Sequence, residues 1–291
     1  MKQKLLTCLI YGRNGSGKSI GGMSLLKIPK LKLRVLALDA NALYGIEDAI
    51  RIHGVTPIAG QLIICQPKMS VADAKASFKA VMSGTSARGS KSPKELIKAR
   101  YDSLINALDS FIGTDYVTGE EVNCGSIYDW KEDTVLIVDG LSTVTEIIED
   151  YERSKLRNPN DVEAPVNGWD FTRNVQDKVN QFAEFLTNPT MISCHVLMYG
   201  HEKRTTHEVS KEERITFSLA GQKGVSMFMG KFATILYAEC VTTPKGKSYY
   251  WNNLKAGTDA VARGIPKHSE KLDHSKLIPD FSLPEYNFFD L

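Results

Sequence analysis

Short apolar runs alternate with amphipathic stretches along most of the chain. The runs are residues 5–11, 31–39, 61–65, 134–139 and 191–204, the last of which ends in polar residues. Apolar residues recur at helical spacing between several of them, in residues 19–27, 144–155 and 169–186. Runs of this length predict buried strands, and their alternation with helices predicts a mostly parallel sheet that helices cover on both faces. The pattern therefore predicts an α/β fold.

A longer stretch between the third and fourth runs interrupts this alternation. Residues 70–112 are mostly helical in pattern, and a small, polar and basic loop at residues 84–93 separates two of the expected helices. We therefore predict a helical insertion at about residues 68–130. The insertion would interrupt a single core domain that spans residues 1–266.

The last part of the chain predicts an edge of the sheet and a tail. Two apolar runs, residues 232–240 and 248–254, flank a turn with Pro and Gly, which predicts antiparallel edge strands near the C-terminus. Residues 267–291 form a C-terminal tail that is first polar and then aromatic. Docking on its own domain or on a neighbouring chain would account for the tail's aromatic residues, Phe281, Tyr286, Phe288 and Phe289.

Composition excludes few functions but indicates the compartment. The 36 basic and 34 acidic residues give a net charge of +2, which argues neither for nor against a nucleic-acid partner. Five cysteines are scattered without a C-x-x-C pair: Cys8, Cys65, Cys124, Cys194 and Cys240. They are typical of small buried side chains in a reducing compartment. No signal peptide or membrane span is predicted, so we expect a cytoplasmic protein with no membrane contact.

The strongest chemical signal follows the first apolar run. Residues 12–19 read G-R-N-G-S-G-K-S, which matches the G-x-x-x-x-G-K-S pattern of the Walker A phosphate-binding loop. Its glycines let backbone N–H groups converge on an anion at the start of a helix. Lys18 would reach the β- and γ-phosphates of ATP, and the Ser19 hydroxyl would ligate Mg²⁺. The predicted nucleotide-binding residues are Gly12, Arg13, Asn14, Gly15, Ser16, Gly17, Lys18 and Ser19.

Polar residues at the ends of later runs are candidates for the same site. Asp139 ends a fully apolar run, as in a Walker B strand, and would hold Mg²⁺ through water opposite Ser19. Asp39 ends the second run and is a catalytic candidate, although it could instead cap the next turn. His201 lies at the polar end of the fifth run, whereas His195 lies within that run and is expected to pack in the core. ATP and Mg²⁺ are therefore the expected cofactors.

Taken together, these motifs resemble the phage-type RecA-like AAA ATPases, which include the Sak-type recombination and annealing ATPases of bacteriophages. The similarity runs from residue 5 to about residue 266. It is carried by L-I-Y-G-R-N-G-S-G-K-S, L-D-A-N, L-I-V-D-G-L-S, V-L-M-Y-G-H-E-K, S-L-A-G and the late K…A-R-G-I-P. The resemblance implies a RecA-like P-loop NTPase that hydrolyses ATP and acts on single-stranded DNA. It also implies a homo-oligomeric ring or filament in the cytoplasm of a bacterial host.

The resemblance assigns roles to single residues and shows one departure. His201 would sense the γ-phosphate of ATP. RecA-like ATPases end the second strand in D-A-E or D-x-E, and their Glu activates the attacking water, but this position is Asn41 here. An amide cannot act as a general base. Either Asp39, Glu47 or another carboxylate takes this role, or hydrolysis is slow.

Basic residues in three segments are candidate contacts for charged partners. Lys255 and Arg263 would, by the same resemblance, reach a neighbouring subunit's γ-phosphate, or they are surface charges. Seven basic residues against one acidic residue lie between residues 75 and 100, which fits a DNA-binding surface or a solvated helix pair. A charged hairpin after His201 occupies the place where recombinases carry DNA loops, although its charges alternate in sign.

Three other functions share some of these signals. A DNA-packaging motor of the terminase type would have Glu after Asp139, where this chain has Gly140. A nucleoside kinase shares the Walker A loop, but residues 88–100 are only a weak candidate for its Arg-rich lid. A nucleotide-switched DNA-binding module with little turnover would be consistent with Asn41.

Overall fold

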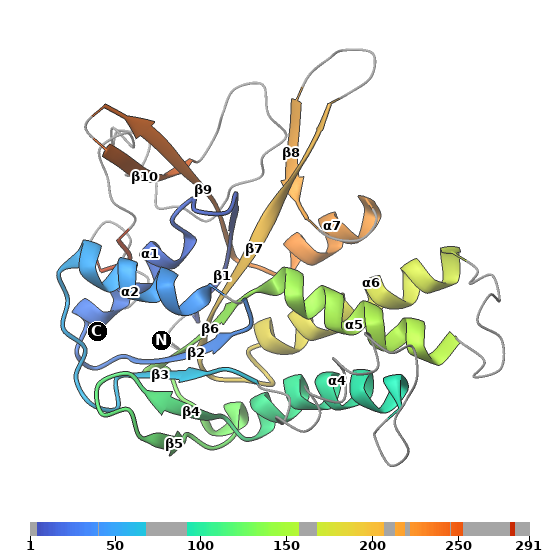
Figure 1. The fold of residues 1–291 in the computed structure, drawn as a ribbon, viewed down its shortest axis with the longest axis horizontal. Helices are drawn as coiled ribbons and strands as arrows, with labels where there is room; N and C mark the ends of the chain where they lie inside the picture. The colour runs from blue at the N-terminus through green and yellow to red at the C-terminus, as the bar shows by residue number, and fades with distance from the viewer. Residues whose placement is uncertain are drawn as a thin grey trace.

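A largely parallel β-sheet forms the centre of the protein (Figure 1). The computed structural model describes residues 5–39, 41–67, 92–156, 168–206, 213–218, 222–244, 246–252 and 280–282. Within these described residues the sheet has ten strands, in the order β10-β9-β1-β7-β6-β2-β3-β4-β5, with β8 paired to β7. The strands from β9 to β3 in this order run parallel to one another.

The parallel strands coincide with the predicted apolar runs. They are β1 (Thr7–Gly12), β2 (Lys32–Ala37), β3 (Leu62–Cys65), β6 (Thr134–Asp139), β7 (His195–Thr206) and β9 (Thr234–Thr243). Every residue of β1, β3 and β6 is buried, as expected for strands that are covered on both faces. The predicted α/β class with a mostly parallel sheet is confirmed.

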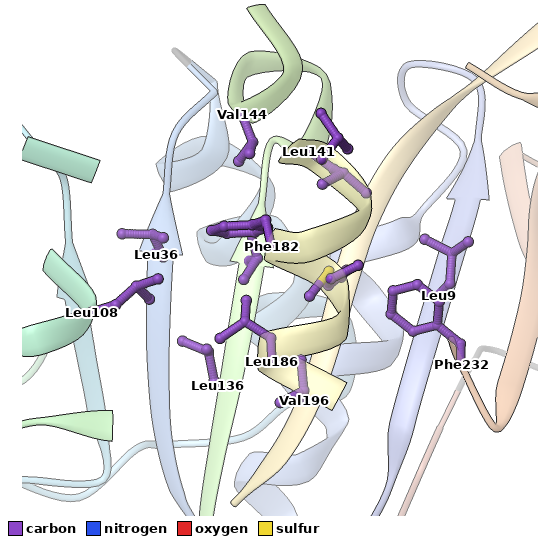
Figure 2. Packing of buried hydrophobic residues seen from close by; sticks show 14 of the residues in the cluster. Leu9, Leu36, Leu108, Leu136, Leu141, Val144, Phe182, Leu186, Val196 and Phe232 are labelled. Atoms are coloured by element: carbon purple, nitrogen blue, oxygen red, sulfur yellow. The ribbon is translucent and has the colours of Figure 1, made fainter. Parts of the chain in front are cut away.

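Helices cover the two faces of the sheet and form two separate apolar clusters with it. One face carries α1 (Lys18–Met23), η1 (Ser24–Lys27) and α2 (Ala42–His53). The other carries α4 (Pro93–Asp109), η2 (Ile127–Asp129), α5 (Leu141–Leu156), α6 (Gly168–Thr187) and α7 (Gln222–Gly230). Figure 2 shows how side chains of α5 and α6 pack onto β1, β6 and β7. Within the described parts of the chain, no helix combines the length and the apolar character that crossing a membrane requires.

Both edges of the sheet are antiparallel, and one of them corrects the predicted insertion. Strand β10 (Gly246–Asn252) pairs antiparallel with β9 and forms the predicted C-terminal edge. The prediction that β9 is also an antiparallel edge strand is wrong, because β9 pairs in parallel with β1 on its other side. At the other edge, β4 (Ile112–Asp115) and β5 (Glu121–Asn123) form a hairpin beside β3, within the stretch predicted to be helical. The carboxylate of Asp115 is buried and accepts the N–H groups of Gly60, Val117 and Thr118, which fixes this hairpin.

Within the described residues, α4 is the helical part of the predicted insertion. The N-cap residue Ser92 and Glu95 exchange side-chain and backbone hydrogen bonds in a capping box, and Pro93 occupies the first turn. The prediction of a helical insertion up to about residue 130 is wrong beyond Asp109, where β4 and β5 follow. Strands of three and four residues are too short for an alternating pattern to distinguish them from loop. Residues 68–91, which include most of the predicted basic loop, lie outside the described residues.

A short piece of the tail packs on the same face as α1 and α2. Phe281 is 2% exposed and belongs to the apolar cluster of that face. Its N–H donates to Ser24 Oγ at 2.7 Å, and the neighbouring Asp280 forms an ion pair with Lys27. Phe281 thus docks on its own domain, while the other aromatic residues of the tail lie outside the described residues.

Candidate nucleotide-binding site

The predicted site residues meet where parallel strands end. In the register of the sheet Gly12 is opposite His201, and Ala37, two residues before Asp39, is opposite Asp139. A cavity of about 500 Å³ opens at this edge. The predicted residues that line it are Asn14, Gly15, Ser16, Gly17, Lys18, Ser19, Asp39, Asp139 and His201. Open α/β sheets bind ligands at this end of their strands.

The loop between β1 and α1 has the backbone that its glycines predict. Gly15 and Gly17 have φ angles of 72° and 85°, which side-chain-bearing residues rarely adopt. The Lys18 ammonium donates to the carbonyl oxygens of Gly12 at 3.2 Å and Arg13 at 2.9 Å. Burial lowers the pKa of Lys18, while the charges of nearby carboxylates, Asp139 first, oppose that shift. The ammonium is therefore held over the loop beside the cavity.

Ser19 and Asp139 face each other from α1 and β6. Ser19 Oγ donates to Asp139 Oδ2 at 3.4 Å. Burial, with the nearby charge of Asp39, raises the pKa of Asp139 to about 6. A hydroxyl and a carboxylate oxygen on opposite walls are ligands that Mg²⁺ accepts. The predicted metal residues therefore fit the ion they were assigned to.

Two further hydroxyl groups fit phosphate oxygens. The Oγ atoms of Ser16 and Ser142 are buried and have no hydrogen-bond partner within the described residues. Both residues line the cavity. Because a buried hydroxyl without a partner is costly, an acceptor in the cavity would stabilise both.

Asp39 connects three elements of the site. Its Oδ1 accepts the Thr143 hydroxyl of α5 at 2.9 Å, and its Oδ2 lies 3.6 Å from His201 Nε2. The contact with His201 is the main cause that lowers the pKa of Asp39, and the hydrogen bond from Thr143 adds to it. Asp39 thus stays ionised and orients the His201 ring.

Gly140, which directly follows Asp139, has no space for a side chain. Its φ angle is 116°, and a Cβ atom here would lie 2.7 Å from Asp39 Oδ1 and 2.9 Å from Asp39 N. The backbone and side chain of Asp39 therefore occupy the place where a motor of the terminase type carries its Glu. This lack of space explains why residue 140 is a glycine.

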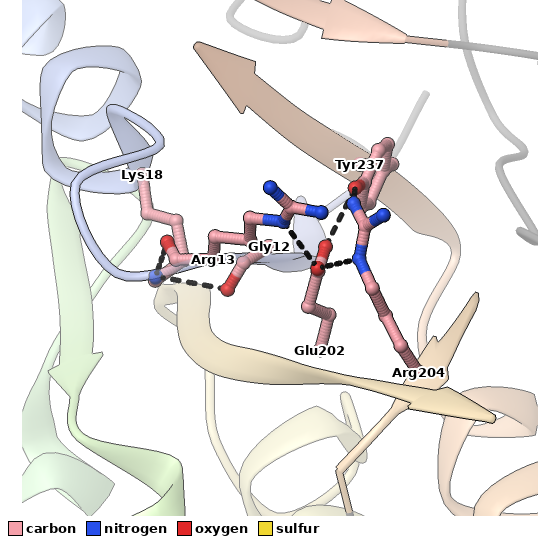
Figure 3. A network of polar contacts seen from close by, with 6 residues as sticks. All are labelled: Gly12, Arg13, Lys18, Glu202, Arg204 and Tyr237. Atoms are coloured by element: carbon pink, nitrogen blue, oxygen red, sulfur yellow. Dashed lines mark hydrogen bonds and ion pairs between the residues drawn. The ribbon is translucent and has the colours of Figure 1, made fainter.

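The Arg13 side chain forms an ion pair with Glu202. It points away from the cavity, and its Nε donates to Glu202 Oε1 on β7 at 2.9 Å (Figure 3). Glu202 also accepts hydrogen bonds from Arg204 and from the Tyr237 hydroxyl, the latter at 2.6 Å. Arg13 is one of the predicted nucleotide-binding residues, but its side chain does not line the cavity, because the buried carboxylate of Glu202 binds it. Gly12 does not line the cavity either and contributes only its carbonyl oxygen to Lys18.

Glu202 is ionised within this network. Burial opposes its ionisation, but hydrogen bonds from Arg204, Tyr237 and Arg13 outweigh it, so the pKa of Glu202 is lowered. His201 and Glu202 are adjacent on β7, so their side chains point to opposite faces of the strand. Strand β7 thus contacts the cavity through His201, and it contacts the start of the phosphate-binding loop through Glu202.

His195 packs in the core, as predicted. It begins β7, is 0% exposed, and its Nδ1 accepts the Leu6 N–H at 2.9 Å. Burial lowers the pKa of His195 to about 4. The side chain is therefore neutral at pH 7 and structural.

We expect His195 to make the protein less stable as the pH falls from about 6.5 to about 4. In this window the unfolded chain protonates the imidazole and the folded chain does not, so unfolding is favoured by up to about 1.4 kcal/mol per pH unit. His195→Asn retains an acceptor for the Leu6 N–H but does not titrate. Urea unfolding of both proteins at several pH values should show that the variant loses less free energy of unfolding as the pH falls. An equal loss of this free energy in the two proteins would contradict the expectation.

Sequence reasoning missed several residues of the cavity, among them Ser142, Thr143, Glu146 and Tyr249. Glu146 on α5 and Tyr249 on β10 both line it. Glu146 lies three and four residues after Thr143 and Ser142, so a helix that starts at Leu141 would have placed all three side chains on one face. Tyr249 packs against Gly17, a contact between chain segments that no local pattern encodes.

The structure describes the positions of Asn41 and Glu47 but not those of Lys255 and Arg263, the two residues predicted to reach a neighbouring subunit. Asn41 lines the cavity, whereas Glu47 is exposed on α2 and does not. Lys255 and Arg263 lie outside the described residues. Of the predicted catalytic residues, the four that the structure describes, Lys18, Asp39, Asp139 and His201, all line the cavity.

Two of the three basic residues of α4, Lys98 and Arg100, pair with acids. Lys98 pairs with Asp102 at 2.5 Å, and Arg100 pairs with Asp150 at 3.4 Å. This matching favours a solvated helix over a DNA-binding surface for α4. It also places Arg100 away from the cavity, which disfavours a kinase-type lid there.

A scan of protein-family models finds no match to this chain, and no curated protein matches it significantly.

Proposed function

We propose that the chain binds Mg·ATP and hydrolyses it as a RecA-like P-loop NTPase. The observation that carries this proposal is the convergence of Lys18, Ser19 and Asp139 on one cavity at the ends of parallel strands. Lys18 would compensate the charge of the β- and γ-phosphates, and Ser19 and Asp139 would hold Mg²⁺. The ion, when bound, would neutralise charge on the phosphoryl oxygens.

His201, held by Asp39, would sense whether the γ-phosphate is present. Asp39 fixes the His201 ring, and His201 lies on β7, between the strands that carry the loop and Asp139. Strand β7 continues past Glu202 into a hairpin with β8 (Glu213–Phe217), which projects from the body of the protein (Figure 1). A change in the contacts of His201 would therefore act directly on the hairpin. This continuity supports the sensor role.

We further propose that single-stranded DNA is the partner, in recombination or replication. This proposal rests on the resemblance to the phage-type RecA-like ATPases and on the hairpin, whose β7 strand carries the exposed Lys203. The same resemblance supports a homo-oligomeric ring or filament in the cytoplasm of a bacterial host. A DNA-packaging motor of the terminase type is a weaker alternative. Such a motor carries its catalytic Glu at the position of Gly140, where Asp39 leaves no space for a side chain. A switch module with little turnover is favoured by Asn41.

Steady-state ATP hydrolysis and equilibrium binding of Mg·ATP test these proposals together. Each should be measured without DNA, with single-stranded or double-stranded DNA, and at two salt concentrations. We expect binding that requires Mg²⁺, and hydrolysis that single-stranded DNA stimulates and salt suppresses. Stimulation by double-stranded DNA alone would favour a packaging motor. Binding without hydrolysis under every condition would favour the switch module, and absence of binding would contradict the proposal.

A further inference from the structure

The cavity lacks the general base that a RecA-like site carries at the end of its second strand. The residue at that position, Asn41, lines the cavity and is exposed. Its amide cannot take a proton from water. If the chain hydrolyses ATP, as proposed above, another residue of this cavity has to accept that proton.

Four carboxylates line the cavity within the described residues: Asp39, Asp48, Asp139 and Glu146. Three of them are engaged. Asp139 is buried and faces Ser19, where it would hold the metal. Asp39 is bound by Thr143 and His201, as described above, and Asp48 accepts a hydrogen bond from Arg51 at 2.7 Å. A carboxylate that is already hydrogen-bonded or paired with a cation is a weaker base.

Glu146 differs from these three. It is exposed on α5, and within the described residues it has no hydrogen bond or ion pair. It lies one helical turn beyond Ser142 and Thr143, which line the same cavity. We propose that Glu146 is the general base of ATP hydrolysis, and that it replaces the carboxylate absent at Asn41.

The proposed step is an in-line displacement at the γ-phosphorus. A water molecule loses one proton to a carboxylate oxygen of Glu146, and its oxygen forms a bond to the γ-phosphorus. The bond between this phosphorus and the β–γ bridging oxygen breaks, and its electron pair leaves with ADP. Protonated Glu146 then returns the proton to solvent, so the products are ADP, inorganic phosphate and one proton.

The test compares Glu146→Gln with Glu146→Asp and with a matched control on the same helix, Glu149→Gln. Glu149 pairs with Arg153 at 3.0 Å and does not line the cavity. Two quantities should be measured for each protein at one pH: the Kd for Mg·ATP, and the single-turnover rate of hydrolysis. We expect Glu146→Gln to bind Mg·ATP with the wild-type Kd and to hydrolyse it about 10²–10⁴-fold more slowly.

The split between binding and rate separates a base from a structural residue. A structural change at residue 146 would weaken Mg·ATP binding, whereas loss of a base lowers the single-turnover rate and leaves the Kd unchanged. Glu146→Asp retains a carboxylate and should hydrolyse ATP faster than Glu146→Gln, and Glu149→Gln should match the wild type.

The outcomes distinguish this assignment from the proposed function. Hydrolysis by Glu146→Gln at the wild-type rate would overturn the assignment and leave ATP hydrolysis intact. Should Glu146→Gln fail to fold, hydrolysis by Glu146→Ala at the wild-type rate would overturn it equally. Binding without hydrolysis in the wild-type protein would also overturn it. Absence of Mg·ATP binding in the wild type would overturn the proposed function and this assignment together.

Discussion

Lys18→Ala should abolish detectable hydrolysis of ATP and strongly weaken binding of Mg·ATP. The Lys18 ammonium lies on the carbonyl oxygens of Gly12 and Arg13, beside a cavity that is lined by four carboxylates, Asp39, Asp48, Asp139 and Glu146. Removal of one preorganised donor to developing charge costs about 10²–10³ in rate in enzymes. Without Lys18 these carboxylates would also repel the phosphates. Calorimetric titration and a phosphate-release assay measure the two effects.

Lys32→Ala is the matched control for this substitution. Lys32 is exposed and pairs with Asp133 at the opposite end of the sheet from the cavity, where β2 begins. Its loss should leave binding and hydrolysis near the wild-type values. Normal hydrolysis by Lys18→Ala would show that the site is wrongly assigned. An equal loss in Lys32→Ala would show that the effect is not specific to the loop.

The strands and the loop could be predicted because their signals are local. A strand that is buried on both faces is apolar throughout, so β1, β3 and β6 are visible as continuous runs. The Walker A loop is likewise a pattern of neighbours, since its glycines and Lys18 act within one turn of chain. The carboxyl ends of parallel strands then had to meet, which placed Asp39, Asp139 and His201 near the loop.

The contacts that complete the site could not be predicted because they join distant segments. Arg13 and Glu202 are 189 residues apart in sequence, and Thr143 is 104 residues from Asp39. Periodicity shows which residues face inward but not which partner they find. The motif predicts that Arg13 contributes to the nucleotide site, but it does not show that an ionised carboxylate on the next strand binds the Arg13 side chain.

Phe281→Ala should lower the free energy of unfolding by up to about 3–5 kcal/mol, the range for removal of a buried aromatic side chain. Phe281 is 2% exposed and packs in the apolar cluster beneath α1 and α2. The loss cannot exceed the free energy with which the tail docks, because a destabilised tail can leave the domain without unfolding it. Urea unfolding measures the total loss, and limited proteolysis measures release of the tail. Phe281→Leu should show a smaller loss in both assays.

Release of the tail should also weaken Mg·ATP binding, because the tail supports the helix that carries Lys18 and Ser19. Phe281 N–H donates to Ser24 Oγ at 2.7 Å, and this hydroxyl donates to the Gly21 carbonyl at 2.5 Å. When the tail leaves, Ser24 loses a partner and the apolar face of α1 is exposed. Phe281→Ala should therefore raise the Kd for Mg·ATP without a direct contact to it. An unchanged Kd together with faster proteolysis of the tail would show that α1 keeps its geometry alone, and unchanged stability would show that Phe281 is not docked in solution.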